Sequence, residues 1–556
     1  MKKIFKIDYS GDTLLAAADS LFDEGRNTEA LGILNKNAAL NGNDEVSYFM
    51  YAEIYDELGL HDKAIQNLFK SLDYDSEDDP SECYKGLAVC YMNLADKRMC
   101  SYYLGLYMEA GGAFDETTEE LQDFVANDPP KSPLKFVYPP EIADFTGEFD
   151  QGVVQAMNDQ TKEAIKTFDR IPEGNSLYAS ARMNIATCQM LRGNYKAAED
   201  ECLRILQKEP DNTLALINMA NVCIEKKDIA KAREIAKGFI GYETDSREEM
   251  YKIATIFCDS GMHREAYDCF TRMVYEQETY HLNVLYFRAV AAFNARMGQE
   301  ALDAINLMLD VYPVSICALY TKSLIYQGMK SDEYFQMDYF FGLPDDVARD
   351  FTALLEAFTR LSKTRAREIY KETGILNVIL WCFDGEFMED RYDLQDKALN
   401  VAVKIGEYDI VRDYLLERRL DNRIKFHALI QLAERNTDES YGIVVSDIMF
   451  RVNYRKLKIG RRSHAPFLRA YGTIVARFSF IDERMGEIIA PFAERIYAKM
   501  DSMDLMELCD DADTLGMAMY EIAGQSFEKL PEETMAAILN TNVSRVKELI
   551  ALLGVV

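Results

Sequence analysis

Apolar side chains recur along this chain at the three- and four-residue intervals of an amphipathic helix. Two such runs are Tyr48, Tyr51 and Tyr55, and Met250, Ile253 and Phe257. Residues at this spacing fall on one face of a helix, whereas a half-buried strand alternates apolar and polar residues. No alternating run in the chain is long enough to indicate a sheet. The pattern therefore predicts an all-α protein.

Small residues divide the helical sequence into units of one length. Alanines recur at intervals of 34 residues, at Ala164, Ala198, Ala232 and Ala266, with Ala30 and Ala64 upstream and Ala301 at an interval of 35. A second small residue lies 12 positions before the alanine in most units, at Ala18, Ala52, Ala186, Ala220, Ala254 and Ala289. Two small residues let helix backbones approach closely, and a Gly between the helices supplies a tight turn. This period indicates a stack of two-helix hairpins.

The residues around these alanines also repeat. Segments 59–68, 193–202 and 261–270 read GLHDKAIQNL, GNYKAAEDEC and GMHREAYDCF, and Pro210 and Pro313 each end a second helix. This Gly-x-Tyr/His-x-x-Ala signature resembles the tetratricopeptide repeat family over residues 11–342. The resemblance implies eight hairpins that begin near 11, 45, 81, 145, 179, 213, 247 and 282, with Cys100 replacing Ala in the third. Segment 316–342 resembles a degenerate ninth unit, and the sequence after 345 faintly resembles HEAT repeats.

Four segments follow from this pattern. We expect N-terminal repeats at 1–110, a main array at 145–342 and an irregular helical region at 345–556, which either continues the superhelix or forms a separate domain. Segment 111–144 is acidic, and five of the 13 prolines lie between 129 and 140. It is expected to be a linker, or a strap that places Phe136 and Tyr138 in a groove of the chain. Helices after 345 are expected at 346–372, 394–403, 408–418, 424–433, 439–452, 466–479, 483–499, 503–523 and 532–553.

Composition narrows the class of protein. The net charge of −31 is concentrated in the first 344 residues, and an acidic surface repels phosphate backbones, so nucleic acid is not expected there. The start, MKKIFKIDYSGD, lacks the apolar run of a secretory signal, and no stretch of 18 uncharged apolar residues predicts a membrane span. The eleven cysteines contain no Cys-x-x-Cys pair and are expected to be buried thiols. We expect a cytoplasmic protein with no membrane contact.

Motifs for catalysis are not found. His61 and His263 occupy the same repeat position, which Tyr195 fills in another unit, so a role in packing or in the turn is expected. No zinc-ligand spacing, phosphate-binding glycine loop or nucleophile motif occurs. We therefore expect a non-enzymatic protein without a metal or cofactor. An enzyme with an unrecognised site is the remaining, third alternative.

The resemblance implies that the first helix of each unit lines a concave face that binds a protein or an extended peptide. Candidate residues on these helices are Met183, Asn184, Asn218, Asn221, Tyr251, Lys252, Tyr286 and Asn294. An amide both donates and accepts hydrogen bonds and therefore matches a peptide backbone, while tyrosine offers an apolar ring with a polar tip. Asparagine at this position also serves helix packing alone, which is the alternative. The resulting expectation is a scaffold or adaptor.

A second candidate site is electrostatic. Residues 448–481 include no acidic residue, and the candidate anion-binding residues within them are Arg451, Arg455, Lys456, Lys458, Arg461 and Arg462. This basic window is expected to be a solvated loop, or to dock on the acidic first half of the chain, in cis or between subunits. An external ligand would instead make the protein a regulator that engages nucleic acid or an anionic, phosphorylated partner.

Overall fold

The structure is a computed structural model of the 556-residue chain. It describes residues 9–74, 79–126, 145–331, 335–384, 392–420, 422–433, 440–453, 465–478, 485–503 and 505–524, and residues 531–554 except 533–534, 537–538 and 540. The chain divides into two compact units. The first comprises Met1–Asp128, Val314–Ile316 and Gly342–Val556, and the second comprises Pro129–Pro313 and Cys317–Phe341.

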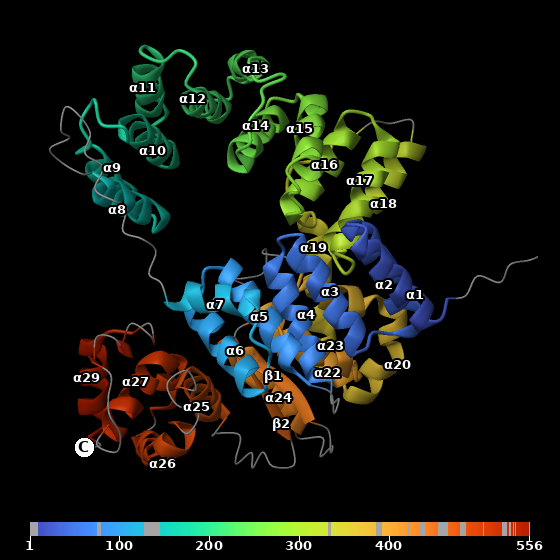
Figure 1. The fold of residues 1–556 in the computed structure, drawn as a ribbon, viewed down its shortest axis with the longest axis vertical. Coiled ribbons are helices and arrows are strands. Elements are labelled where there is room, and N and C mark those ends of the chain that lie inside the picture. Colours follow the sequence, from blue (N-terminus) through green and yellow to red (C-terminus); the bar gives the residue numbers. More distant parts are fainter. Residues whose placement is uncertain are drawn as a thin grey trace, which may run out of the picture. The chain divides into compact units, whose positions relative to one another are not determined.

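The first unit begins with three helical hairpins (Figure 1). Their helices are α1 (Gly11–Asp23) and α2 (Asn27–Asn41), α3 (Glu45–Glu57) and α4 (His61–Asp73), and α5 (Ser81–Asn93) and α6 (Lys97–Glu109). A further helix, α7 (Glu116–Ala126), packs on α6 and α5. This helix takes up part of segment 111–144, and residues 127–144, with Phe136 and Tyr138, lie outside the described residues.

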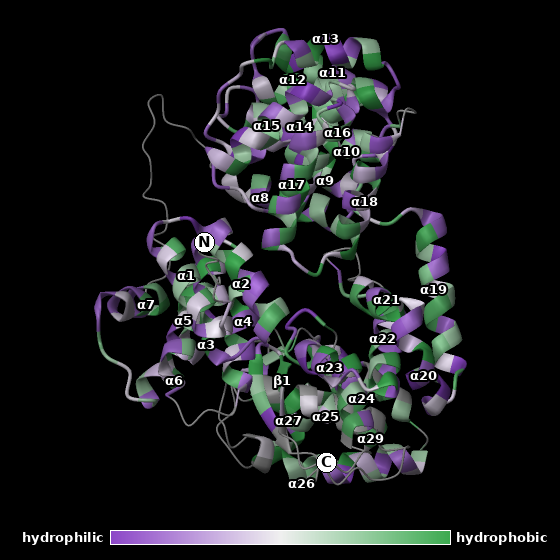
Figure 2. Cartoon of the chain, turned by 90° about the vertical axis from the view of Figure 1, so that its right-hand side faces the viewer, coloured by the Kyte–Doolittle hydropathy of each residue, from purple (hydrophilic) through white to green (hydrophobic). Residues whose placement is uncertain are grey.

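The second unit contains five more hairpins, which follow one another along an arc in Figure 1. They are α8 (Thr146–Met157) with α9 (Thr161–Phe168), α10 (Tyr178–Leu191) with α11 (Tyr195–Leu206), α12 (Thr213–Glu225) with α13 (Ile229–Lys237), α14 (Arg247–Asp259) with α15 (His263–Tyr275), and α16 (Leu282–Asn294) with α17 (Gly298–Val311). A last helix, α18 (Ile316–Lys330), follows them. Figure 2 shows apolar and polar residues side by side on each of these helices, as stacked amphipathic hairpins require.

The repeated small residues are the contact points of the hairpins. Every alanine of the 34-residue series is fully buried, as is Cys100, which replaces alanine in the third hairpin. The upstream small residues are buried as well, with exposures of 0 to 2%. The prediction of a stack of two-helix hairpins, and of an all-α fold class, is therefore confirmed.

The turn inside each hairpin needs a left-handed backbone. Gly59, Gly193 and Gly261 adopt φ values of 69°, 72° and 69° at this place. Four other hairpins have a residue with a side chain there, with φ values of 57° to 63°: Ala95, Asp159, Lys227 and Arg296. A side chain at positive φ costs on the order of 1 kcal/mol, which the surrounding helix packing offsets.

The C-terminal part of the first unit is mostly helical. Its elements are α19 (Asp345–Arg360), α20 (Lys363–Thr373), α21 (Ile375–Trp381), α22 (Tyr392–Ile405), α23 (Tyr408–Leu415), α24 (Asn422–Ala433), α25 (Ala465–Phe478), α26 (Met485–Met503), the 3-10 helix η4 (Met506–Asp510), α27 (Ala512–Ala523) and α29 (Val543–Leu553). The single helix expected over 346–372 is divided in two, because Ser362 caps the start of α20 through the Arg365 amide.

The prediction of a helix over 439–452 is wrong. This segment forms an antiparallel hairpin of β1 (Ser440–Val445) and β2 (Ile448–Asn453), paired from Ser440–Asn453 to Val445–Ile448. The turn residues Ser446 and Asp447 both have positive φ, at 53° and 67°, as a two-residue hairpin loop requires. The β-branched run Ile443–Val445 is buried, and such a run fits a strand better than a helix.

Candidate functional site

In the second unit, a non-helical segment lies against helices of the last two hairpins. This segment, Phe335–Phe341, is here called the aromatic segment. Its side chains alternate in burial: Phe335, Met337, Tyr339 and Phe341 are buried or half-buried, whereas Gln336, Asp338 and Phe340 are exposed. A period of two is the signature of an extended backbone. The second helix of the degenerate ninth unit is therefore replaced by an extended chain.

The residues that hold this segment come from three helices and are here called the seat. They are Cys258 on α14, His263 on α15, and Tyr286, Phe287, Phe293 and Asn294 on α16. Each belongs to the second unit, as does the aromatic segment.

Asn294 binds the backbone of the aromatic segment at both of its polar groups. Its Nδ2 donates to the Met337 carbonyl oxygen at 2.8 Å, and its Oδ1 accepts from the Met337 N–H at 2.9 Å. Asn294 is 4% exposed and Met337 is 7% exposed, so the two bonds are shielded from water. Because the contacts are to backbone atoms, they do not depend on the side chain at position 337.

Aromatic pairs surround this central contact. The rings of Tyr286 and Phe341 meet edge to face with centroids 5.0 Å apart, and the rings of Phe287 and Tyr339 do so at 5.9 Å. Phe335 lies against Phe293 at 5.2 Å. Edge-to-face pairs of this kind contribute about 0.5–1.5 kcal/mol each beyond their buried area.

His263 contacts two residues of the aromatic segment. Its Nδ1 lies 2.9 Å from the Tyr339 hydroxyl, and its Nε2 lies 2.9 Å from the Gln336 Nε2. Because the amide nitrogen of Gln336 can only donate, Nε2 accepts, and the neutral ring carries its proton on Nδ1. Burial lowers the pKa of His263, and the nearby Arg233 lowers it further.

Cys258 completes the seat beneath Tyr339. Burial raises the pKa of its thiol well above the ordinary value, and a hydrogen bond with Tyr339 acts in the opposite direction. The thiol is therefore neutral at physiological pH, and it is 5% exposed. It contributes packing and a weak polar contact, and has the character of a core residue.

Comparison with known proteins gives matches among solved structures only. No protein-family model and no curated protein matches the chain. YrrB, described as a TPR protein with an unusual peptide-binding site, is 18% identical, covers 32% of this chain and 92% of its own, and has a TM-score of 0.26. The TPR2AB domain of yeast Sti1 with pHSP90 is 16% identical, with coverages of 45% and 98% and a TM-score of 0.20. The human IFIT1 dimer with m7Gppp-AAAA is 11% identical, with coverages of 78% and 93% and a TM-score of 0.26.

The chain's own geometry decides its repeat type. Paired helices of 13 residues, such as α3 with α4 and α14 with α15, recur at the 34-residue interval with a left-handed residue at each turn. The array therefore consists of two-helix repeats with a period of about 34 residues.

Other predicted binding residues of the helical-repeat array lie away from the aromatic segment. Met183 is 1% exposed and belongs to the core between α10 and α13. Asn218 is 7% exposed and donates from Nδ2 to the Met183 carbonyl oxygen at 3.3 Å, which links two successive first helices. Asn184 and Asn221 are half-buried. Their place on α10 and α12 agrees with the packing alternative as well as with a binding face.

Tyr251 and Lys252 lie on α14. The Tyr251 ring meets the Phe270 ring edge to face with centroids 6.2 Å apart, and Lys252 pairs with Glu248 on its own helix. Of the eight predicted binding residues, Tyr286 and Asn294 thus contact the aromatic segment. The aromatic segment was not predicted from the sequence to be a bound, extended chain. Its alternating sequence FQMDYFF, before Gly342, is nevertheless the pattern of an extended chain.

In the first unit, the basic window contributes a contact within the chain. Arg451 on β2 donates to the carbonyl oxygens of Leu72 at 2.9 Å and Tyr74 at 2.8 Å. The solvated-loop expectation is therefore wrong for this residue, because the window begins inside a docked hairpin. Arg455, Lys456, Lys458, Arg461 and Arg462 lie outside the described residues.

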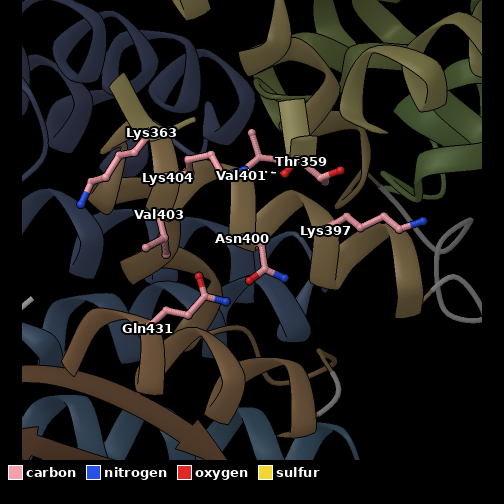
Figure 3. A pocket seen from close by; sticks show the side chains of 8 residues that line it. All are labelled: Thr359, Lys363, Lys397, Asn400, Val401, Val403, Lys404 and Gln431. Carbon is pink, nitrogen blue, oxygen red and sulfur yellow. Dashed lines mark hydrogen bonds between the residues drawn. The ribbon is translucent and has the colours of Figure 1, made fainter. Parts of the chain in front are cut away.

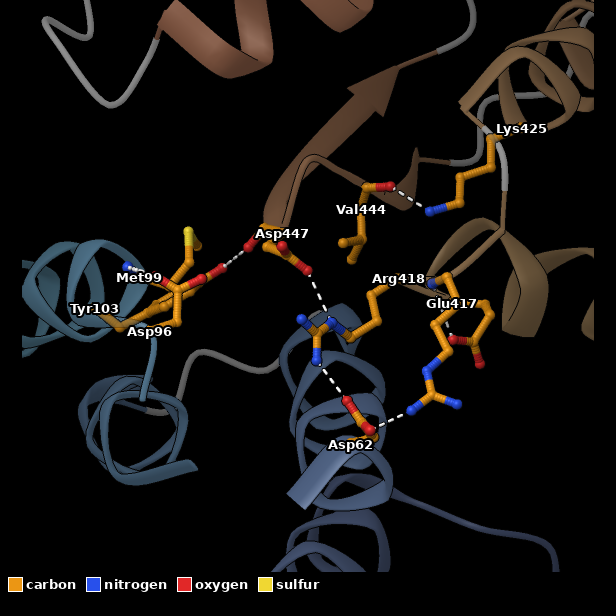
Figure 4. Close-up of polar contacts among 10 residues, drawn as sticks. Asp62, Asp96, Met99, Tyr103, Glu417, Arg418, Lys425, Val444 and Asp447 are labelled. Atoms are coloured by element: carbon orange, nitrogen blue, oxygen red, sulfur yellow. Dashed lines mark hydrogen bonds and ion pairs between the residues drawn. The ribbon is translucent and has the colours of Figure 1, made fainter. Parts of the chain in front are cut away.

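Further ion pairs join this hairpin and the turn that follows α23 to the N-terminal repeats of the same unit. Arg418 donates to Asp62 at 2.5 Å and to Asp447 at 2.9 Å, and Arg419 also pairs with Asp62 (Figure 4). The Tyr103 hydroxyl donates to the Asp447 carbonyl oxygen at 2.6 Å. These contacts hold the β1–β2 turn between α4 and α6.

A surface hollow of about 680 Å³ lies among α19, α20, α22 and α24 (Figure 3). Three lysines line it, but Lys404 donates to three carbonyl oxygens at the end of α19, and Lys397 lies near Glu356 and Asp393. In Figure 3 the ammonium groups of Lys363 and Lys397 point in opposite directions. The lysines therefore do not converge on one anion.

The part of the chain that the structure describes contains no disulfide, no metal-binding cluster and no membrane-spanning helix. All eleven cysteines lie within it, and none forms a disulfide. Its histidines, cysteines and carboxylates form no cluster suited to a metal ion. No helix among the described residues combines the length and the apolar character needed to cross a membrane.

Proposed function

We propose that this protein is a non-enzymatic scaffold or adaptor whose tetratricopeptide-type array binds an extended segment of a partner protein. The observation that carries the proposal is the double hydrogen bond between Asn294 and the Met337 backbone. A seat that binds both the N–H and the carbonyl group of one residue in an extended chain can accept many different side chains at that residue. Such a contact serves recognition of a peptide better than it serves a fixed core.

The wider binding face is proposed to run along the first helices of the array. Asn184 on α10, Asn221 on α12 and Tyr251 on α14 are half-buried and therefore accessible in part to a ligand. Stacked repeats of this kind present an extended surface, and amides and tyrosines on it match a peptide backbone. Met183 and Asn218, being buried, are proposed to position this face from beneath.

Site-specific photo-crosslinking in the native cell tests this proposal. A photoreactive amino acid replaces Asn184 or Tyr251 on first helices, and the matched controls carry it at Lys196 or Arg264, which are exposed on second helices. We expect the first-helix positions to capture one recurrent protein, identified by mass spectrometry, and the controls to capture it at least about tenfold less. Equal capture from both helix sets, or capture only from the controls, contradicts the proposal.

A further inference from the structure

The seat is already filled by the chain itself. The aromatic segment follows α18 closely in sequence, and four of its side chains alternate toward α14, α15 and α16. It supplies the Met337 backbone to Asn294 and three rings to Tyr286, Phe287 and Phe293. The segment therefore occupies the seat with the backbone and ring contacts that the seat offers.

We propose that the aromatic segment is an internal stand-in for the partner, which the partner displaces. The partner is then an extended protein segment with large apolar, mainly aromatic, side chains at four alternate positions. This inference rests on the proposed function, and it adds the chemistry of the partner segment and the way in which access to the seat is controlled.

The segment is only partly buried. Met337 and Phe341 are buried, with exposures of 7% and 6%, whereas Phe335 and Tyr339 are half-buried and Phe340 is 52% exposed. The alanines between the paired helices, by contrast, are fully buried. Release of the segment leaves those interhelical contacts in place, because the segment lies on the outside of hairpins that are already packed.

The charges at the seat also indicate what kind of segment it selects. The seat residues are uncharged, apart from His263 when it is protonated, and burial keeps His263 neutral. The outward-facing Asp338 is exposed, so a charge is tolerated between the apolar positions. Selection therefore depends on the spacing of the apolar side chains, and a contiguous apolar run places half of its side chains in water.

Tethering makes the internal segment a strong competitor. A short tether gives an effective concentration on the order of 1 mM, so a segment whose own intrinsic Kd for the seat is about 10 μM weakens the binding of any partner roughly 100-fold. A change that loosens the segment without altering the seat must therefore raise the affinity for an added peptide.

Peptide binding to the full chain tests the inference. The probe is a fluorescent peptide of residues 335–342, FQMDYFFG, and the loosened variant is Met337→Pro, because proline has no N–H to donate to Asn294. We expect Met337→Pro to bind the peptide at least tenfold more tightly than the unaltered chain. The matched control, Phe340→Ala, changes an exposed residue of the same segment and should alter the affinity less than about twofold.

Two further measurements test whether the gain in peptide affinity depends on the seat and on the spacing of the apolar side chains. Adding Asn294→Asp to Met337→Pro removes the donor to the peptide carbonyl and should reverse the gain. A peptide of the same composition with its apolar residues in one run should bind at least tenfold more weakly. If Met337→Pro lowers the thermal midpoint, Tyr339→Ser replaces it, since Tyr339 is half-buried.

The outcomes separate this inference from the proposed function. Equal affinity of the peptide for the unaltered chain, the loosened variant and the control overturns displacement. No binding to a folded, loosened variant, or equal binding of the two peptides, overturns the alternating partner segment. Neither result affects the photo-crosslinking of first-helix positions, which tests the proposed function independently.

Discussion

Arg412 and Asp73 lie 339 positions apart in the chain and form an ion pair in which the carboxylate is 1% exposed. Arg412 also donates to the Asp73 carbonyl oxygen at 3.0 Å, and the Gly442 amide donates to the Asp73 carboxylate at 2.6 Å. Burial raises the pKa of Asp73, and these donors oppose that shift. One carboxylate thus joins α4, α23 and β1 within the first unit.

Removing the guanidinium should destabilise the first unit strongly. Arg412→Ala leaves the buried Asp73 carboxylate without its cation, which costs about 3–5 kcal/mol. The earliest transition in urea unfolding should move to lower denaturant. Arg419→Ala is the control, because Arg419 is 48% exposed beside Asp62 and should cost less than about 1 kcal/mol. Equal effects of the two substitutions would show that burial of Asp73 is not what matters.

The repeat alanines should not tolerate a larger side chain. Ala232 on α13 is fully buried, whereas Ala230 on the same helix is exposed. Ala232→Leu forces the helices of its hairpin apart and should cost about 1–3 kcal/mol or more, while Ala230→Leu should stay within about 0.5 kcal/mol. Thermal unfolding followed by circular dichroism gives both values, and a well-tolerated Ala232→Leu would contradict close helix packing there.

Acid should loosen the aromatic segment. Burial and then Arg233 lower the pKa of His263, with Glu265 opposing, so the seated state binds its proton less tightly than the released state. Neutral His263 favours the seated segment above the ordinary histidine pKa of about 6.5, and that preference is lost as the pH falls below it. Protonation would also place a hydrogen on Nε2 of His263, where it faces the Gln336 amide nitrogen, which is itself a donor.

Hydrogen exchange measures this loosening. The protection factor of the Met337 amide, corrected for intrinsic exchange, should fall between about pH 7.5 and about pH 5.5. His263→Asn keeps a neutral polar side chain and should remove the pH dependence. A protection factor that changes equally in both proteins would assign the effect to another group.

Buried thiols should resist alkylation in the native protein. Burial raises the pKa of Cys202 to about 12 and the pKa values of Cys83 and Cys269 to about 11. At about pH 8 a thiol with a pKa of about 11 is about one part in a thousand thiolate, the reactive form. Iodoacetamide should therefore modify these residues slowly, and all eleven cysteines rapidly in guanidinium, as counted by mass spectrometry. Rapid native labelling of Cys202 would contradict its burial.

The sequence was sufficient for the helical hairpins because their contacts are local. Ala266 and the upstream Ala254 are only 12 residues apart and are both fully buried within one hairpin, α14 with α15, so a local sequence pattern is enough to indicate it. The β1–β2 hairpin was not predicted because its β-branched run, Ile443–Val445, is short, and the periodicity of a short apolar run does not separate a strand from a helix. What stabilises it is distant in sequence: Asp73 and Tyr103 contact Gly442 and Asp447.

The candidate site was predicted in part for the same reason. Asn294 and Tyr286 were candidate binding residues because they lie on a first helix, and both contact the aromatic segment in the structure. The segment was grouped with a degenerate ninth repeat, because its period of two spans only seven residues. That these residues bind an external peptide stays a prediction.

The long sequence separation within the first unit has a consequence for synthesis on the ribosome. At about 5–20 residues per second, translation takes on the order of 20–70 s to proceed from Asp73 to Arg412. During that interval the N-terminal hairpins expose the face of α4 that later receives β1 and α23. A nascent chain stalled before residue 412 should therefore recruit chaperones that a chain extended past residue 453 no longer binds.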